Sequence, residues 1–233
     1  MISLANKTAL ITGSSRGIGQ QIALGLAKHH CSIVLHGRTR ENCLATESQL
    51  ASAGVKVYTV CGELDSEAGI QSIVDGVKNG PGHIDILYNN AAIMSPWLPI
   101  NETPLSVWLS TLQVNLFAAI ALCSAFVPGM KDREFGRVIN LTSGIKETPN
   151  LAAYGVSKAA IDKYSQELAH DCRGTNVLVN YLDPGWLSTD LGGPNAMFTV
   201  DTVLPGALVP ALLEDNGPTG RLYCAQDYKY LEG

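Results

Sequence analysis

A tyrosine and a lysine stand four positions apart in the stretch YGVSK, residues 154–158. In a helix, this spacing places Tyr154 and Lys158 on one face, one turn apart. A free tyrosine has a pKa of about 10, and a nearby cation lowers that pKa by stabilising the phenolate. The pair therefore predicts a general acid–base group. The alternative is a packed tyrosine that happens to lie beside a surface lysine.

A glycine-rich stretch, TGSSRGIG at 12–19, follows the apolar segment KTALIT and precedes an amphipathic segment. Its glycines allow a sharp turn and the close approach of a ligand. The free amides at the start of the following helix favour a phosphate. The spacing GxxxGxG differs from the GxGxxG of many dinucleotide-binding folds. We interpret the stretch as a phosphate-binding turn, with a plain strand-to-helix turn as the alternative.

The end of the second predicted strand reads HGRTR, residues 36–40, and contains no acidic residue. Folds that bind NAD usually place an acid there for the ribose hydroxyls. Arg38 could instead bind a 2′-phosphate through its planar fork, and Arg16 in the glycine-rich turn could join it. This pattern favours NADP(H), with solvated surface arginines as the alternative.

Short apolar segments alternate with longer amphipathic ones along the whole chain. Strands are predicted at 7–12, 31–37, 55–60, 83–89, 136–143, 176–182 and 220–225. Helices are predicted at 17–30, 41–53, 66–79, 105–130, 152–173 and 201–214. Nearly wholly apolar strands separated by helices predict a parallel sheet covered on both faces. Because neither a repeat nor a linker interrupts the pattern, we expect one doubly wound α/β domain spanning residues 1–233.

Composition narrows the class of partner. The net charge is −5 without a basic stripe, which argues against nucleic acid. Apolar runs such as 116–128 read as too short and too interrupted to span a bilayer, and the start of the chain does not resemble a signal peptide. The six cysteines form no close pair and the five histidines show no ligand spacing. We therefore expect a cytoplasmic protein with reduced cysteines, no metal and no membrane partner.

Further motifs accompany the tyrosine and the glycines. NNAA stands at 89–92, Asn115 lies in QVNLF, Ser143 ends a predicted strand, and DPG stands at 183–185. In their order and spacing, these motifs resemble those of the short-chain dehydrogenase/reductase family over nearly the whole chain. The resemblance implies a Rossmann-like domain with a seven-stranded parallel sheet flanked by helices. It also implies hydride transfer between a nicotinamide cofactor and a carbonyl or alcohol.

Carried over by position, the resemblance implies a role for each catalytic residue. Tyr154 would donate a proton to the carbonyl oxygen, and Lys158 would lower the pKa of that tyrosine and bind the nicotinamide ribose. Ser143 would hydrogen-bond the substrate oxygen, and Asn115 would hold a water of the proton relay. The residues expected to bind the cofactor are Gly13, Ser15, Arg16, Gly17, Ile18, Gly19, Arg38, Glu63, Leu64, Asn89, Ala91, Tyr154, Lys158, Pro184, Gly185, Leu187 and Thr189.

The substrate pocket is expected between three loops that carry apolar side chains. Met94, Ile145 and Trp186 would line it beside Ser143 and Tyr154, which suits a ketone, an aldehyde or a 3-oxoacyl group. The alternative is that the tryptophan only packs its loop. Lys146 and Glu147 could touch a polar substrate, with solvated charges as the alternative reading.

Three functions remain open at this point. The first is an NADPH-dependent carbonyl reductase, and the second is an NAD-linked alcohol dehydrogenase. The third is a regulator that binds nucleotide without turnover.

The resemblance also implies a homodimer or homotetramer formed through the helices at 105–130 and 152–173.

Overall fold

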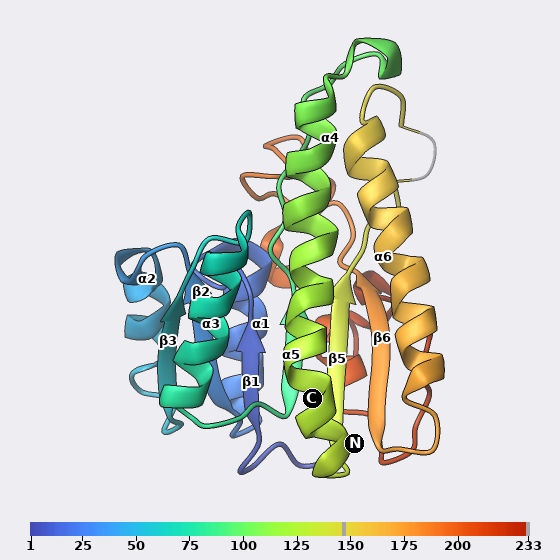
Figure 1. Ribbon diagram of the computed structural model, residues 1–233. Coiled ribbons are helices and arrows are strands. Elements are labelled where there is room, and N and C mark those ends of the chain that lie inside the picture. The colour runs from blue at the N-terminus through green and yellow to red at the C-terminus, as the bar shows by residue number, and fades with distance from the viewer. Residues whose placement is uncertain (146–147, 232–233) are drawn as a thin grey trace.

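A single parallel sheet organises the part of the chain that the computed structural model describes, residues 1–145 and 148–231. Its strand order is β3-β2-β1-β4-β5-β6-β7 (Figure 1). The strands are β1 (Thr8–Ile11), β2 (Ser32–Gly37), β3 (Val57–Cys61), β4 (Ile86–Asn89), β5 (Gly136–Leu141), β6 (Val177–Asp183) and β7 (Leu222–Cys224). The predicted seven-stranded parallel sheet is therefore confirmed.

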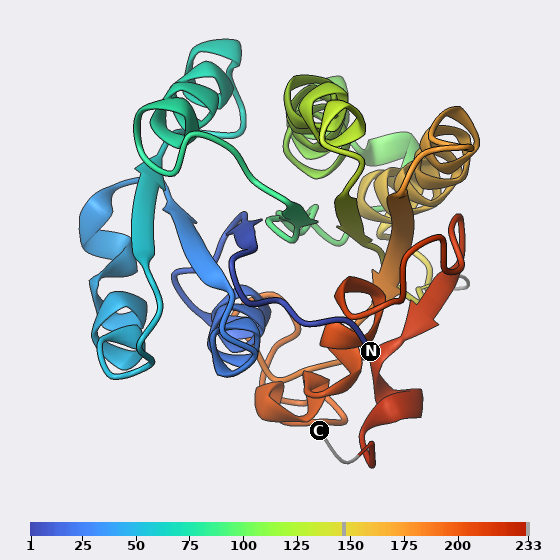
Figure 2. The same cartoon turned by 90° about the horizontal axis from the view of Figure 1, so that it is seen from below.

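Helices cover both faces of this sheet, as the view from below shows (Figure 2). One face carries α1 (Gly17–Lys28), α2 (Arg40–Leu50) and two 3-10 segments, Val200–Val203 and Gly206–Ala211. The other face carries α3 (Glu67–Asn79), α4 (Leu105–Leu112), α5 (Ala118–Asp132) and α6 (Ala152–Asp171). Further 3-10 turns are formed by Ile100–Glu102 and Ala225–Tyr228.

The apolar strands are buried on both sides because successive side chains point to opposite faces. Ile11 and Leu35 belong to the core that also contains Ile22 of α1. Leu10 and Val34, one position earlier on the same strands, belong to the core beneath α3, α5 and α6. Two apolar layers thus hold the sheet, and the functional side chains lie at its edge.

The long helix predicted at 105–130 is continuous but contains an irregular turn. A π-helical turn over Gln113–Phe117 joins α4 to α5. Such turns insert one extra residue into the helix and often occur at functional sites. Here the turn includes Asn115, whose side chain is buried.

The same helical run bears on the membrane question. Leu105–Asp132, with 28 residues and a mean hydropathy of 1.7, is the one run in the described part of the chain that is long and apolar enough to cross a membrane. It is longer than the 116–128 segment that the sequence singles out. Half of its most apolar window is buried inside the protein, as in a core helix of a soluble protein, so the run is weak support for a membrane span.

The helix predicted at 201–214 differs from what the structure forms. The structure forms two 3-10 segments there instead of one α-helix. Pro205 and Pro210 explain the difference, because proline lacks the backbone donor that a continuous helix requires.

The order of the strands reverses its direction between β1 and β4, which lie side by side in the sheet. In open α/β sheets, ligands bind in the crevice outside the carboxyl ends of the strands at such a switch point. The glycine-rich turn follows β1, NNAA begins at the last residue of β4, and Ser143 follows β5. The fold therefore brings the predicted motifs to one edge of the sheet.

Candidate active site

Tyr154 lies in the first turn of α6 and is buried to 4% exposure. Its hydroxyl lies near the side chain of Ser143, which follows β5, and that polar contact affects the pKa of the tyrosine. The Ser143 Oγ atom also accepts a hydrogen bond from the backbone N–H of Ile145 at 3.3 Å. The structure thus brings together a hydroxyl pair that the sequence places eleven positions apart.

Lys158 lies one helical turn further along α6, as predicted, and is also buried. Its Nζ atom donates to the backbone oxygen of Leu141 at 2.9 Å and lies over the ring of Tyr154, 5.7 Å from the ring centre. Burial lowers the pKa of Lys158 to about 8, against an opposing effect of Asp162. The ammonium therefore loses its proton much more readily than that of an ordinary lysine.

The pKa of Tyr154 moves in the direction opposite to the prediction. Burial raises it, the hydrogen bond to Ser143 lowers it, and the charge of Asp183 raises it further, with a net rise. The expected net lowering is not found, because desolvation of the phenolate outweighs the contacts that favour it, and the stabilisation of the phenolate by Lys158 stays a prediction. The phenol is therefore protonated at neutral pH, as a proton donor must be, but with its raised pKa it is a weaker acid than a free tyrosine.

Asn115 uses its amide to hold a neighbouring loop. Its Oδ1 accepts from the backbone N–H of Ile93 at 2.8 Å, and its Nδ2 donates to the oxygen of Ile93 at 2.9 Å. The same Nδ2 donates to Ser157 Oγ at 3.1 Å. The side chain therefore fixes the segment after β4 against α6, and its role in holding a relay water stays a prediction.

The glycine-rich turn adopts the conformation that its glycines predict. Gly13 and Gly17 have φ angles of 63° and 59°, which disfavour residues with a side chain. At Gly19, a Cβ atom would collide with the backbone oxygen of Gly13 and lie 2.6 Å from Asn90 Nδ2. The start of α1 thus approaches the turn closely, and the first amides of this helix have no acceptor within the helix, which favours an anion there.

Two residues that the sequence analysis did not assign lock this turn to β4. The hydroxyl of Thr12 accepts hydrogen bonds from the backbone N–H groups of Asn90 and Ala91, at 2.9 and 3.0 Å. The side-chain amide of Asn90 donates to the oxygens of Thr12 and Gly13 at 2.8 and 3.2 Å. Thr12 belongs to TGSSRGIG and Asn90 to NNAA, so the motifs themselves could have identified both residues.

A small cavity lies beside the turn. Its wall joins several residues expected to bind the cofactor with others from the long helix: Thr12, Leu64, Asn89, Ala91, Val114, Asn115, Ala118, Ala119 and Leu122. Leu64, Ala91 and Val114 provide apolar surface of the kind that an aromatic base requires. The turn and the close approach at Gly19 fit the phosphates of a dinucleotide, whereas the cavity, with about 10 Å³ open to a water-sized molecule, is too small to enclose a base.

The side chain of Asn89 makes its hydrogen bonds inside the core, and its place beside the cofactor stays a prediction. Its Nδ2 donates to Asn140 Oδ1 at 2.8 Å and to Cys123 Sγ at 3.4 Å, inside the core. Its Oδ1 is buried without a hydrogen-bond partner in the described part of the chain. The side-chain nitrogen is thus engaged in joining β4 to β5 and is not free for a ribose hydroxyl.

The predicted phosphate-binding arginines are in different states. Arg38 is exposed directly after β2, and no carboxylate pairs with it among the described residues. The Nε of Arg16 pairs with Asp190 Oδ2 at 2.6 Å, and both side chains are exposed. Glu63, also expected to bind the cofactor, is exposed at the end of β3, next to the buried Leu64.

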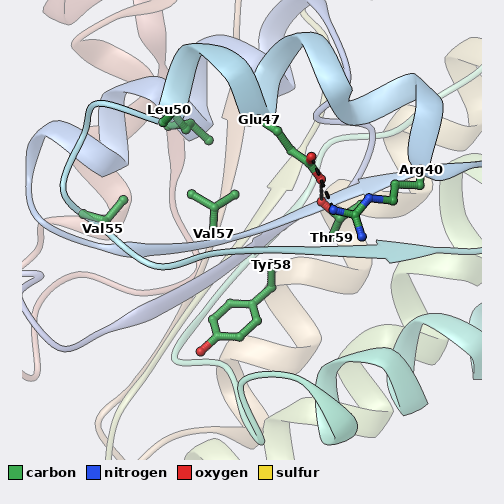
Figure 3. A pocket seen from close by; sticks show the side chains of 8 residues that line it. Arg40, Glu47, Leu50, Val55, Val57, Tyr58 and Thr59 are labelled. Atoms are coloured by element: carbon green, nitrogen blue, oxygen red, sulfur yellow. Dashed lines mark hydrogen bonds and ion pairs between the residues drawn. The ribbon is translucent and has the colours of Figure 1, made fainter.

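A separate hollow lies between α2 and β3 (Figure 3). Arg40 points across it to Glu47, with 3.7 Å between the guanidinium and the carboxylate, and Glu47 also accepts from the hydroxyl of Thr59. None of the predicted catalytic residues lines this hollow. Arg40 is engaged in this ion pair with Glu47. Arg38, the other arginine of HGRTR, has no ion pair among the described residues.

The loop after β6 covers the glycine-rich turn. Pro184 and Leu187 are buried, and the backbone N–H of Gly185 donates to Asp183 Oδ1 at 2.9 Å. The side chain of Thr189 lies close to Gly17, since a Cβ placed on that glycine would be 3.6 Å from the Thr189 methyl. Of the loop residues expected to bind the cofactor, Thr189 is thus placed next to the turn.

The predicted substrate residues are less closely assembled. Met94 and Ile145 are half-buried, whereas Trp186 is 55% exposed and donates to the oxygen of Gly192 at 2.8 Å. Lys146 and Glu147 lie outside the described residues. The substrate assignments stay predictions.

Within the described part of the chain, there is also no group of three His, Cys, Asp or Glu side chains that could hold a metal.

Comparison with known proteins places this geometry in a family. The sequence model of the short chain dehydrogenases matches residues 7–197. The chain belongs to the short chain dehydrogenase family. It is therefore an oxidoreductase of the kind that acts on CH–OH or C=O groups.

Individual members of the family show the range of its chemistry. The 3-oxoacyl-[acyl-carrier-protein] reductase FabG of Aquifex aeolicus (strain VF5) is 33% identical over 193 residues, which cover 82% of this chain and 77% of the relative. The structure of an NAD⁺-bound xylitol dehydrogenase matches with 26% identity and a TM-score of 0.84, covering 96% and 98% of the two chains. A metagenomic short-chain oxidoreductase in complex with NADP matches with 28% identity and a TM-score of 0.85, covering 96% and 99%. The solved structures similar to this chain thus include one with bound NAD⁺ and one with bound NADP.

Proposed function

We propose that the protein is an NADPH-dependent oxidoreductase that reduces a ketone, an aldehyde or a 3-oxoacyl group to the alcohol. The observation that carries the proposal is the cluster of Tyr154, Ser143 and Lys158 at the carboxyl edge of the sheet. When bound, NADPH supplies the hydride. The side chains of the protein supply orientation, a proton and a charge.

Each member of the cluster has a role that its contacts support. The hydroxyls of Ser143 and Tyr154 lie near each other, so both can contact one carbonyl oxygen, which Ser143 would orient. Tyr154, whose pKa is raised, then gives its proton to that oxygen. Lys158, with a pKa of about 8, is mostly charged at neutral pH and stabilises the phenolate left behind.

The preference for NADPH rests on the end of β2. Arg38 is exposed, unpaired within the described residues and follows the buried His36 and Gly37. An arginine near this position accommodates a 2′-phosphate, and an acid that would bind the ribose hydroxyls of NAD is absent from HGRTR. Pro184, Leu187 and Thr189 would hold the nicotinamide half, and the apolar side chains of Leu64 and Ala91 would pack against the adenine.

The remaining parts of the proposal concern the substrate and the assembly. We expect one domain over residues 1–233, a small-molecule substrate against Met94, Ile145 and Trp186, and a cytoplasmic homodimer or homotetramer without nucleic-acid or membrane partners. The relative from Aquifex aeolicus is named for a 3-oxoacyl substrate, which supports including that class. The complete set of Asn115, Ser143, Tyr154 and Lys158 disfavours a regulator without turnover, because such a protein has no need of an acid–base group.

Titration with NADPH and with NADH tests the cofactor, and NADPH oxidation against a panel of ketones and 3-oxoacyl thioesters tests the reaction. We expect NADPH to bind at least about tenfold more tightly and ketones to be reduced. Preference for NADH would support the NAD-linked dehydrogenase. Binding without turnover on any substrate would support the regulator.

A further inference from the structure

His36 is the penultimate residue of β2 and is almost fully buried. It contacts the glycine-rich turn through several atoms. Its Nδ1 accepts a hydrogen bond from the backbone N–H of Gly13 at 3.0 Å. Its backbone oxygen accepts from the N–H of Ser14 at 3.1 Å, and its backbone N–H donates to Ser14 Oγ at 2.9 Å. The first two residues of the turn after Thr12 are thus held by one histidine.

The other ring nitrogen reaches the end of the next strand. The Nε2 of His36 lies 3.0 Å from the backbone oxygen of Gly62, which directly follows β3. A carbonyl oxygen can only accept, so Nε2 must carry the proton. Nδ1 must then be the unprotonated acceptor for Gly13. The two bonds together fix the neutral ring in one tautomer.

These contacts join the three segments proposed to hold the adenosine half of the cofactor. They are the glycine-rich turn, Arg38 two residues after the histidine, and Glu63 with Leu64 directly after Gly62. No other side chain in the described residues bonds to both Gly13 and Gly62. A change at the ring therefore affects the turn and the end of β3 at once.

We propose that His36 is a positioning residue for the adenosine half of the cofactor site, and that only its neutral Nε2-protonated form supports tight binding. The inference rests on the proposed use of a nicotinamide cofactor. Protonation of Nδ1 would place a donor against the N–H of Gly13 and break that bond. The turn would lose its support, and the amides that follow would lose their fixed direction towards the phosphates.

The environment of the ring determines the pH at which this happens. Burial lowers the pKa of His36 below its ordinary value of 6.5, and the hydrogen bond to Gly62 opposes that change. Cofactor binding should therefore be complete above pH 6.5 and be lost as the pH falls through the lowered pKa. The ionisable side chains on the surrounding elements are Arg16 in the glycine-rich turn, Arg38, Arg40, Glu41, Cys43 and Glu47 after β2 and on α2, and Cys61 and Glu63 at the end of β3.

Two substitutions at this position separate the hydrogen bond from the titration. His36→Leu removes both ring bonds, and we expect NADPH binding to weaken by about tenfold or more at pH 7.5, because the N–H of Gly13 loses its partner. His36→Asn keeps an acceptor at the place of Nδ1 but cannot titrate. We expect it to bind NADPH within about threefold of the wild type at pH 7.5 and more tightly than the wild type at pH values below the lowered pKa of His36. His83→Asn, before β4 at the opposite end of the sheet, is the matched control and should follow the wild type at every pH.

The 2′-phosphate of NADPH also titrates in this range, and the comparison between protein variants with the same ligand removes that effect. Circular dichroism and the melting temperature show whether each variant is folded. NMR of the ¹⁵N-labelled ring tests the tautomer without any cofactor, and we expect a neutral ring with its proton on Nε2. A ring charged at pH 7, or a folded leucine variant that binds NADPH as the wild type does, would overturn the inference alone. A wild type that binds neither NADPH nor NADH would overturn the proposed function as well.

Discussion

The Nζ atom of Lys158 lies over the ring of Tyr154, 5.7 Å from its centre, and donates to the backbone oxygen of Leu141 at 2.9 Å. The ammonium is thus buried between α6 and the end of β5, where its charge is poorly solvated. Burial shifts the pKa of Lys158 to about 8, which means that folding opposes its charged form. The buried position of Lys158 places its charge beside Tyr154 but lowers the free energy of unfolding.

Replacing this lysine should therefore stabilise the protein while inactivating it. Between pH 8 and 10.5, the unfolded chain binds more protons than the folded chain, so the free energy of unfolding of the wild type should rise with pH in that window. At pH 7, we expect Lys158→Met to raise the free energy of unfolding by about 1–3 kcal/mol, after allowing for the lost bond to Leu141. Denaturant titration at pH 7 and pH 9.5 measures both effects. Lys163→Met, exposed on the same helix, should change stability little, and an equal loss in both variants would contradict the argument.

Tyr154→Phe should remove the proton donor and leave cofactor binding intact. The ring stays buried while the hydroxyl that meets Ser143 is lost, so we expect kcat to fall by about 10²–10⁴-fold with the Kd for NADPH nearly unchanged. Single-turnover kinetics and a binding titration measure the two quantities. Tyr164→Phe, on the same helix but bonded to Cys123, is the control and should keep its activity. A fully active Tyr154→Phe variant would show that the proton comes from elsewhere.

The sequence predicts the elements of this site much better than their chemical states. The apolar strands and the motif spacings predict the sheet and the meeting of Tyr154, Lys158 and Ser143, because strand ends and helical turns have fixed geometry. The direction of the Tyr154 pKa is not predictable in this way, because burial depends on packing from several elements. The role of His36 has the same origin, since its bonds to Gly13 and Gly62 require knowledge of three adjacent strands. The π-helical turn at Asn115 is hidden because its sequence continues the apolar pattern of the helix.

Asp183 should set the pH dependence of the tyrosine. Its charge raises the pKa of Tyr154, and its carboxylate lies against Gly144, where a Cβ would be 2.7 Å from Asp183 Oδ2. Asp183→Asn keeps the acceptor for the N–H of Gly185 and removes the charge. We expect the acid limb of kcat/KM for alcohol oxidation with NADP⁺ to move to lower pH. Asp190→Asn, in the same loop but paired with Arg16, should leave that limb in place. An unmoved limb in the Asp183 variant would contradict the electrostatic link.

Arg38 should decide the choice between NADPH and NADH. Arg38→Gln removes the unpaired charge after β2, and we expect NADPH to bind about tenfold more weakly while NADH binding changes little. Arg16→Gln is an informative comparison because Arg16 already pairs with Asp190, so its effect should be smaller. Arg221→Gln, beside β7, should have none. Isothermal titration with both cofactors measures these ratios, and an unchanged preference in Arg38→Gln would remove this residue from the site.

The outer face of α4, α6 and the intervening π-helical turn should form an interface between copies of the chain. Leu105, Leu109, Phe117 and Val156 are 71%, 58%, 46% and 46% exposed, above a small buried cluster of Leu116, Ala119 and Ile161. Exposed apolar side chains on neighbouring helices favour burial against a partner. We expect Phe117→Glu to convert the oligomer into a monomer in light scattering, because a charge would enter the apolar contact. Leu44→Glu, 51% exposed on α2, is the matched control and should keep the assembly of the wild type. A wild type that is monomeric at micromolar concentration would contradict the prediction, since this face would then remain in contact with water.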